Sequence, residues 1–333
     1  MIRSDMASSE LIQELIRAHV DRNDQRFKTV ALQLAAREAR AGHRLVAGRI
    51  KDLVDEAGVP GRNDRATPTP IARTTDELKS VLAVAYPREK LGDIILEGAL
   101  AGVLPRFLDE HRGRRTLEDF GLSPRRRLLL HGPPGCGKTL AATVLAGELG
   151  LPLLRVRIEM LFSRYLGETA TTLTAVFEEM KRVRGVFLFD EFDALGRARF
   201  SASDVGEVNR VVSTFLQLVD ADESTSIIVA ATNGVDELDS AAFRRFDDIV
   251  EMPLPSRRAL ARLLRLRTAS VRLTTRTIDR AADTLEGLSF AEADRAVTEA
   301  RKSVVLTGRR RLSDDDLIEA VAEVRTRFGS VAE

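Results

Sequence analysis

"RLLLHGPPGCGKT", residues 127–139, decides the fold of this chain. A short apolar run ends in a glycine-rich loop, and residues 138–149, which follow, have the composition of a helix. Gly135 and Gly137 let successive backbone N–H groups turn toward one anion, and the helix N-terminus adds its dipole. The loop, residues 132–139, also fits the pattern G-x-x-x-x-G-K-[ST]. The stretch therefore predicts a strand, a phosphate-binding loop and a helix, in that order.

The loop supplies the groups that a nucleoside triphosphate requires. Lys138 is placed to reach the β- and γ-phosphates, and the hydroxyl of Thr139 is a ligand for Mg²⁺. Cys136 contributes its backbone N–H, because a redox role would require an exposed thiol with a lowered pKa. A chance glycine-rich turn is the alternative, which the flanking strand and helix disfavour. The expected nucleotide-binding residues are Gly132, Pro133, Pro134, Gly135, Cys136, Gly137, Lys138, Thr139 and Leu140.

Two further apolar runs end in polar residues that suit hydrolysis. "VFLFDEFDALG", residues 186–196, delivers Asp190 and Glu191 at the end of a buried strand. Asp190 can hold the Mg²⁺ shell, and Glu191 can orient and deprotonate the attacking water. "SIIVAATN", from residue 226, ends in Asn233, whose amide can hold that water or the γ-phosphate; a strand-end asparagine that caps a turn is the alternative. Because they follow a phosphate loop, these residues predict a nucleoside triphosphatase.

Strand-like and helical segments alternate through the middle of the chain. Apolar runs also begin at residues 151 and 248, and helical stretches separate most of the runs. This alternation predicts an α/β domain with a parallel P-loop sheet and helices on both faces. After Pro255 the pattern is helical to the end of the chain, which predicts a second, all-α domain.

The N-terminal region differs from the rest of the chain in its sequence pattern. Residues 8–57 are predicted to be helical because apolar side chains recur at helical spacing. Residues 57–75 are rich in Pro, Gly, Asn, Asp and Thr and show no helical or strand periodicity of apolar residues, which is typical of a linker. The predicted domains are a helical N-terminal domain (1–56), the linker (57–75), the α/β domain (76–255) and the all-α domain (256–333). The predicted apolar faces are formed by Leu11, Ile12, Leu15 and Ile16, by Phe27, Val30, Ala31, Leu34 and Ala35, and by Val46, Ile50, Leu53, Val54 and Ala57.

The composition is that of an ordinary globular protein. Lys and Arg number 51 against 50 Asp and Glu, a net charge of +1, which gives no general reason to expect nucleic-acid or membrane binding. The single cysteine excludes an intramolecular disulfide and a multi-cysteine metal site. No apolar run is long enough for a membrane span, and the acidic residues of the N-terminus do not suit a signal or transit peptide. We therefore expect a cytoplasmic protein.

The motifs, in this order, resemble those of the AAA+ ATPases. They are most similar to the AAA clade proper, the group of katanin, spastin and the proteasomal ATPases. The Walker A motif is "GPPGCGKT", the Walker B motif is "FLFDE", and sensor 1 is Asn233 within "AATN". "GEVNRVVSTFLQLVD", residues 206–220, resembles the helix after the Walker B strand, and "LEGLSFAEADRAVTEA" resembles the lid segment beside the adenine. The resemblance covers residues 76–333 and implies ATP and Mg²⁺ as cofactors and a lid formed by the all-α domain.

The resemblance also implies two arginines that reach across to the ATP of a neighbouring subunit. In "DSAAFRRFDD", residues 239–248, Arg244 and Arg245 are adjacent, whereas the family usually spaces them three apart. The segment looks shortened by two residues, so either arginine is a candidate for the γ-phosphate contact. A guanidinium supplied in trans stabilises the charge that develops on the phosphoryl group and couples hydrolysis to assembly. Two surface arginines without a catalytic role are the alternative.

"SRYLGET", residues 163–169, carries one of the two tyrosines of a chain that has no tryptophan. Tyr165, Leu166 and Gly167 match the aromatic–hydrophobic–Gly tripeptide that the clade places on a loop facing the pore of a hexameric ring. Glycine gives such a loop freedom to move, and the phenol ring offers amphipathic contact to an extended chain. A tyrosine packed at the sheet edge is the alternative. The family has another pore loop at residues 196–204, where the candidates are Arg197, Arg199 and Phe200.

The predicted function is an ATP-hydrolysing machine that remodels proteins. The N-terminal helices recruit a client or partner enzyme, and a homo-oligomeric ring, expected to be a hexamer, pulls the polypeptide through its pore. A nucleic-acid-associated AAA+ loader or regulator is one alternative, against which the balanced charge and the pore tyrosine argue. A scaffold that uses its ATP state to assemble with and activate a partner enzyme is another.

Overall fold

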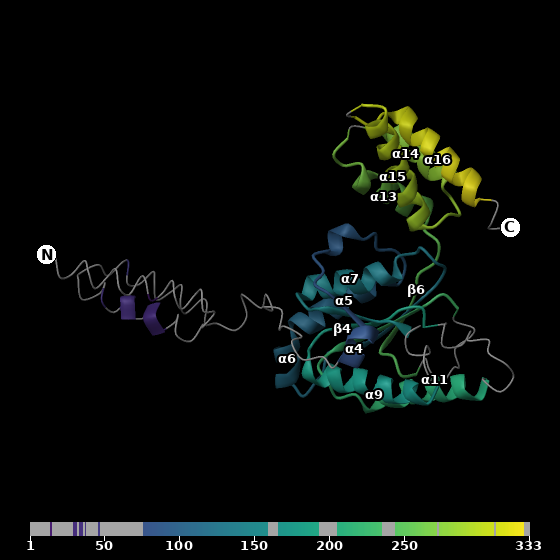
Figure 1. Cartoon of the computed structure of the whole chain (residues 1–333). Helices are drawn as coiled ribbons and strands as arrows, with labels where there is room; N and C mark the ends of the chain where they lie inside the picture. The colour runs from purple at the N-terminus through teal and green to yellow at the C-terminus, as the bar shows by residue number, and fades with distance from the viewer. Residues whose placement is uncertain are drawn as a thin grey trace. The chain divides into compact units, whose positions relative to one another are not determined.

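The computed structural model describes residues 76–158, 166–192, 205–234, 244–271, 273–309 and 311–329, with residues 14, 29–31, 33–35, 37 and 46. The chain divides into two units, Met1–Thr67 and Pro68–Glu333 (Figure 1). Within the described residues, no helix is both long enough and apolar enough to cross a membrane.

In the N-terminal unit, the described residues are helical. Val30, Ala31 and Ala35, three members of one predicted apolar face, are buried. Val46 was assigned to another apolar face, but its side chain is 49% exposed, so that assignment is wrong for this residue. The remaining members of the predicted faces, apart from the half-buried Leu34, and the predicted linker lie outside the described residues.

A six-stranded sheet organises the second unit, with the strand order β1-β3-β4-β5-β2-β6. The strands are β1 (Leu82–Ala85), β2 (Arg127–His131), β3 (Leu153–Val156), β4 (Val186–Phe189), β5 (Ile227–Thr232) and β6 (Asp248–Glu251). The prediction of a parallel sheet is confirmed for β2 to β6, but β1 lies antiparallel to β3 at one edge. The sequence pattern does not predict β1, because "LAVA" is short, has no turn signal before it and buries only Leu82.

Helices cover both faces of this sheet, as the P-loop fold requires (Figure 1). In β2, Leu128 and Leu130 pack into one core and Leu129 into the other, because successive strand side chains point to opposite faces. The first core contains side chains of α5 and α7, and the second contains those of α4, α9 and α11. These helices, with two short ones, are α4 (Asp76–Val81), η1 (Leu91–Asp93), α5 (Leu100–Arg112), α6 (Arg114–Asp119), α7 (Lys138–Leu149), α9 (Leu166–Arg182) and α11 (Val205–Ala221).

The predicted helical domain after Pro255 is confirmed. It consists of α13 (Arg257–Arg267), α14 (Thr275–Thr284), α15 (Phe290–Leu306) and α16 (Asp314–Phe328). Each helix begins after a residue whose side-chain oxygen accepts a hydrogen bond from the first turn: Ser256, Thr274, Ser289 and Ser313. Such caps each stabilise a helix by about 1 kcal/mol, and they define where the four helices start.

Candidate active site

The carboxyl ends of β2, β5 and β4 meet at one edge of the sheet, because these strands are parallel neighbours. A cavity of about 430 Å³ lies at this edge. It brings together ten of the residues that the sequence assigned to the site: Pro134, Gly135, Cys136, Gly137, Lys138, Thr139, Leu140, Asp190, Glu191 and Asn233. Gly132 and Pro133 do not line the cavity, but both contact Lys138 through their carbonyl groups.

The loop between β2 and α7 depends on glycine at three of its positions, Gly132, Gly135 and Gly137, which all have a positive φ. Gly137, the residue before α7, has φ +95°, and Gly135 has φ +78°, which are conformations that other residues adopt at a cost. A Cβ atom at Gly135 would also lie 2.5 Å from the hydroxyl oxygen of Ser289 in the helical domain. The loop carries its backbone N–H groups to the start of α7, where the first helical N–H groups have no partner within the helix. The geometry therefore suits an anion.

Lys138 is the first residue of α7, and its side chain is held against the loop. Its Nζ donates hydrogen bonds to the carbonyl oxygens of Gly132, at 2.6 Å, and Pro133, at 2.8 Å. The residue is only 7% exposed, yet it lines the cavity. A cation that is partly removed from water interacts more strongly with an anion in the same cavity than a fully solvated cation does.

Asp190 lies directly after β4 and is buried, with its two oxygens in different contacts. Its Oδ2 accepts a hydrogen bond from Thr139 Oγ1 at 2.9 Å, and its Oδ1 accepts one from the backbone N–H of Glu191 at 3.1 Å. A hydroxyl and a carboxylate at this separation are the hard oxygen donors that Mg²⁺ prefers, and Mg²⁺ needs only one or two protein ligands beside phosphate and water. The residues therefore fit a magnesium ion bound together with a phosphate group.

Glu191 has the only positive φ among the described residues other than glycine, at +54°. This left-handed conformation is uncommon for a residue with a side chain and is found disproportionately at functional sites. Glu191 is exposed and lines the cavity, as does Asn233, the first residue after β5. A carboxylate and an amide thus face the same space from adjacent strand ends.

The helical domain closes one side of the cavity. The backbone N–H of Ala291, in the first turn of α15, donates to the carbonyl oxygen of Gly135 at 3.1 Å. Three of the lining residues, Phe290, Ala291 and Asp294, lie in "LEGLSFAEADRAVTEA", the segment that resembles the lid beside the adenine. The other lining residues outside the expected site come from three segments without a motif: Asp93, Ile94 and Ile95 near η1, Arg155 in β3, and Leu263 and Arg267 in α13.

Cys136 lies in the loop and is 2% exposed. Burial raises the pKa of its thiol above the ordinary value, although the neighbouring Lys138 acts in the opposite direction. A raised pKa disfavours the thiolate, which is the reactive form. The geometry therefore supports a backbone role for Cys136 and not a redox role.

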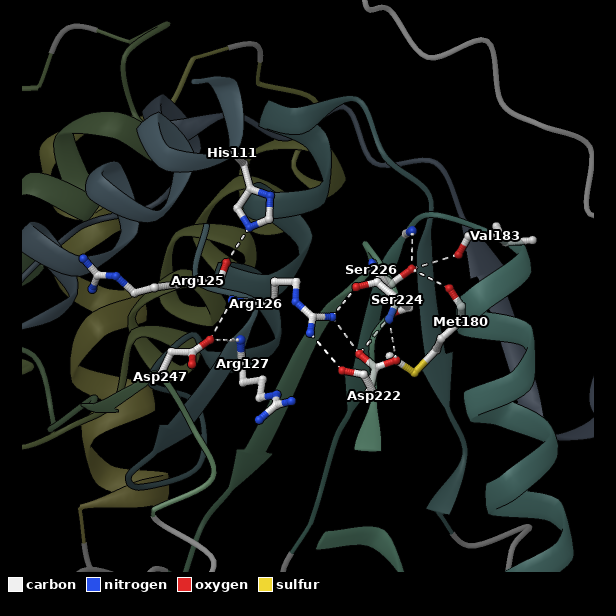
Figure 2. Close-up of polar contacts among 11 residues, drawn as sticks. His111, Arg125, Arg126, Arg127, Met180, Val183, Asp222, Ser224, Ser226 and Asp247 are labelled. Atoms are coloured by element: carbon white, nitrogen blue, oxygen red, sulfur yellow. Dashed lines mark hydrogen bonds and ion pairs between the residues drawn. The ribbon is translucent and has the colours of Figure 1, made fainter. Parts of the chain in front are cut away.

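Arg244 and Arg245 do not line this cavity in their own chain. Arg245 Nε donates to Asp220 Oδ2, near the end of α11, at 2.7 Å. Arg244 is exposed, and no ion pair to it occurs among the described residues. The segment that carries both arginines is also fixed at Asp247, whose carboxylate accepts hydrogen bonds from the backbone N–H groups of Arg126 and Arg127 (Figure 2). Arg244 therefore extends from an anchored turn.

Tyr165, Arg197, Arg199 and Phe200 lie outside the described residues. Leu166 and Gly167 are described only in their backbone, as the first two residues of α9. The sequence assigned both to a loop, so this local assignment is wrong. Helix α9 begins inside the tripeptide, and a glycine in the first turn of a helix is less costly than one in a helix interior.

A second cavity, of about 350 Å³, is lined by residues at the opposite ends of β2 and β5, where these strands begin. Four of its charged side chains form two ion pairs: Arg126 NH1 contacts Asp222 Oδ2 at 2.8 Å, and Arg114 Nε contacts Glu118 Oε1 at 2.6 Å. Figure 2 shows that Arg126 also contacts the backbone of the turn before β5. These contacts fasten β2 to the segment between α11 and β5, so we interpret this network as structural.

His111, beside this network, makes the stability of the protein depend on pH. Its Nε2 donates to the carbonyl oxygen of Arg125 at 2.6 Å, and burial lowers its pKa to about 4 (Figure 2). Between pH 6.5 and 4, the unfolded chain therefore binds a proton that the folded chain does not. We expect the free energy of unfolding to fall by up to about 3 kcal/mol as the pH falls through this range.

His111→Phe should remove the part of this pH dependence that comes from His111, because phenylalanine cannot titrate. Phenylalanine also keeps a ring that can stack on Phe107. Urea unfolding at pH 7 and pH 5 would measure the pH dependence. The variant should be less stable than the wild type at pH 7, by about 1 kcal/mol for the lost hydrogen bond. It should also lose less stability than the wild type on acidification. An unchanged pH dependence would assign the titration to other groups.

The sheet, the glycine loop at a helix N-terminus and the carboxylates of the adjacent strand define the class of the protein. It is a P-loop nucleoside triphosphatase with a helical lid. Residues 128–254 match the family described as "ATPase family associated with various cellular activities (AAA)". The "Uncharacterized AAA family ATPase y4kL" of Sinorhizobium fredii is 35% identical over 327 residues, which cover 97% of this chain and 98% of the relative. The chain belongs to the AAA family of ATPases.

A further relative and two solved structures are similar to this chain. A protein of Pyrococcus abyssi named "Proteasome-activating nucleotidase" is 35% identical over 214 residues, 62% of this chain, and the chain spans 54% of that relative. Among solved structures, the FIGL-1 AAA domain matches with a TM-score of 0.61 and 22% identity, covering 78% of this chain and 92% of that one. The same domain in complex with ADP has a TM-score of 0.60. The similarity to the relative supports the AAA clade, and the similarities to the solved structures show the fold.

Proposed function

We propose that this ATPase uses ATP hydrolysis to remodel protein clients, and that the cavity at the ends of β2, β4 and β5 is its ATP site. The observation that carries the site is the convergence of Lys138, Thr139, Asp190, Glu191 and Asn233 on one cavity. Residues 132–140 bind the nucleotide, with the loop N–H groups and Lys138 on the phosphates. Thr139 and Asp190 hold Mg²⁺, which supplies charge neutralisation to the phosphate oxygens when bound.

Hydrolysis in this site is assigned to two strand-end residues. The carboxylate of Glu191 accepts the proton of the attacking water, which makes the water oxygen a better nucleophile toward the γ-phosphorus. The Asn233 amide donates a hydrogen bond to that water or to the γ-phosphate. The strained backbone at Glu191 supports this role, because it directs an exposed carboxylate into the cavity.

The adjacent arginines receive different roles. Arg244 acts in trans, on the ATP of a neighbouring copy of the chain, because it is exposed and lies outside its own cavity. Arg245 positions it through the contact with Asp220, and Asp247 fixes the same turn to β2. A guanidinium on an anchored turn is held in place without the entropy that a flexible loop would lose. This arrangement requires a homo-oligomer, for which a hexameric ring is the proposed form.

The proposed division of labour follows the predicted domains. Residues 1–56 recruit a client or partner, residues 57–75 link them to the ATPase domain (76–255), and residues 256–333 form the lid. Protein remodelling is supported by the likeness to a relative named proteasome-activating nucleotidase and by the tripeptide Tyr165–Gly167. Client contact at the pore is assigned to the ring of Tyr165, whose amphipathic face suits an extended chain of any sequence.

ATPase stimulation tests whether the client is a protein. The rate of phosphate release is measured with excess unfolded casein, and separately with duplex DNA at low and high salt. The proposal expects stimulation by casein and none by DNA. Stimulation by DNA alone, with the steep salt dependence of phosphate contacts, would replace it with a nucleic-acid function. No stimulation by either probe would favour a scaffold that activates a partner enzyme.

Tyr165→Ala should keep ATP binding, oligomer assembly and most basal hydrolysis, and lose the stimulation by casein. The alanine removes on the order of 150 Å² of aromatic contact surface per subunit. Tyr165→Phe should retain the stimulation, because the ring face and not the hydroxyl makes the contact. If Tyr165 is instead a core residue, the alanine variant should be less stable by roughly 3–5 kcal/mol and lose all activities together. A stable alanine variant with full stimulation would exclude the pore role.

A further inference from the structure

Besides Lys138 and Arg267, the cavity is lined by a third cation, Arg155, which no sequence motif identifies. Arg155, in β3, lines the cavity with Lys138, and its side chain is 49% exposed. It lies on the same face of β3 as Leu153, which packs into the core that contains α7, whereas Leu154 and Val156 pack into the opposite core. The alternation of the strand therefore places Arg155 on the face that carries α7 and the phosphate loop.

The guanidinium of Arg155 contacts the carboxylate assigned to the metal. Its NH2 donates to Asp190 Oδ2 at 2.8 Å, and the same oxygen accepts the hydrogen bond of Thr139 Oγ1 at 2.9 Å. The Asp190 side chain is 9% exposed, so its negative charge would be costly without a cationic partner. Without a metal ion, Arg155 provides that partner.

Arg155 and a metal ion compete for one position. Both carry positive charge, and both need Asp190 Oδ2 or the space beside it, so each weakens the binding of the other in this partly desolvated site. A metal ion that binds with a nucleotide therefore releases Arg155 from Asp190. The released side chain lines a cavity that now contains phosphate groups, which are strong acceptors for a guanidinium.

We propose that Arg155 is a positioning and specificity residue of the ATP site: it holds Asp190 in the empty site and transfers to the terminal phosphate when Mg²⁺ and ATP bind. Its transfer favours ATP over ADP, because the γ-phosphate adds negative charge next to the metal. Arg155 thereby links metal binding at Asp190 to recognition of the triphosphate. This inference rests on the proposed ATP site and adds a residue that distinguishes its two nucleotides.

Arg155→Gln is the test, with Arg157→Gln as the matched control. Arg157 lies two residues after Arg155, directly after β3; it is exposed and is absent from the described lining of the cavity. Calorimetry with Mg²⁺ measures the Kd for ADP and for a non-hydrolysable ATP analogue in the full-length protein. Arg155→Gln should reduce the preference for the ATP analogue over ADP by about 10- to 100-fold, the worth of one charged hydrogen bond. Arg157→Gln should keep the wild-type ratio.

A second readout does not depend on nucleotide. Without nucleotide, Arg155→Gln leaves Asp190 without its cation, so its melting temperature should fall by about 2–4 °C, and millimolar Mg²⁺ should restore it. The wild type should not respond to Mg²⁺ alone, because Arg155 occupies Asp190. Arg155→Lys keeps a positive charge and should recover part of the nucleotide preference, in a protein whose stability is closer to that of the wild type.

The outcomes separate this inference from the ATP site itself. An unchanged nucleotide ratio in Arg155→Gln, or an equal loss of affinity for both nucleotides, would overturn the role of Arg155 and leave the site intact. If the wild type bound neither nucleotide, the proposed site would fail and the role of Arg155 with it.

Discussion

Glu191→Gln is expected to bind ATP as tightly as the wild type and to hydrolyse it roughly 10²–10⁴-fold more slowly. The amide keeps the size and shape of the side chain, but it cannot accept the proton of the attacking water. Glu191 is exposed, and its side chain faces the cavity from a strained turn, so the loss should be catalytic and not structural. Phosphate release measures the rate, and calorimetry with Mg²⁺ and ATP measures the affinity.

A matched control distinguishes the role of Glu191 from a general effect of lost charge. Glu223→Gln makes the same chemical change at an exposed residue that lines the second cavity. It should hydrolyse ATP at the wild-type rate, and both variants should melt within a few degrees of the wild type. If Glu191→Gln retained wild-type turnover, the general base would have to be another residue, and the assignment of the Walker B carboxylates would need revision.

Arg244→Ala is expected to have the other large effect, a loss of hydrolysis of roughly 10³–10⁵-fold with ATP binding retained. Removal of the guanidinium leaves the charge that develops on the γ-phosphoryl group without its partner. The nucleotide keeps all contacts from its own subunit, because Arg244 does not line its own cavity. The ATP-binding curve of the variant should therefore match that of the wild type, although its rate of phosphate release is far lower.

Arg245→Ala serves as the comparison for this prediction. Arg245 and Asp220 form a partly exposed ion pair, with side chains 28% and 49% exposed, and such a pair stabilises a protein by at most about 1 kcal/mol. Its loss should loosen the turn and reduce hydrolysis much less than the loss of Arg244 does. An inactive Arg245→Ala beside an active Arg244→Ala would exchange the two roles. If both variants were as active as the wild type, neither Arg244 nor Arg245 would take part in hydrolysis.

Local signals predicted the part of the fold that forms the phosphate site. The loop at 132–139 and the helix at 138–149 follow from glycine, lysine and strand spacing, and α7 begins and ends at the expected residues. Asp190 follows β4 as expected, because a run of apolar residues that ends in a carboxylate suits a buried parallel strand. The helical domain was also predictable, since each of its helices begins after Ser or Thr.

Long-range contacts account for what the sequence could not predict. Strand β1 has four residues and pairs only with β3, which lies about seventy residues further along the chain, so neither its length nor its register leaves a local pattern. Arg155 has no motif, and its proposed role depends on a contact with Asp190, which follows the neighbouring strand β4. The proposal that Arg244, and not Arg245, acts in trans depends on the contact between Arg245 and Asp220, which only the folded chain identifies.

The central claim is that each ATP is hydrolysed with Glu191 of one subunit and Arg244 of its neighbour. Mixing Glu191→Gln protein with Arg244→Ala protein, each inactive alone, tests this claim most directly. Phosphate release is measured across mixing ratios, under conditions where exchange of subunits is shown by a fluorescent label on each variant. The claim predicts that activity reappears and is greatest near equal amounts, because some interfaces then pair an intact carboxylate with an intact arginine. No activity at any ratio, in oligomers shown to have exchanged, would contradict it.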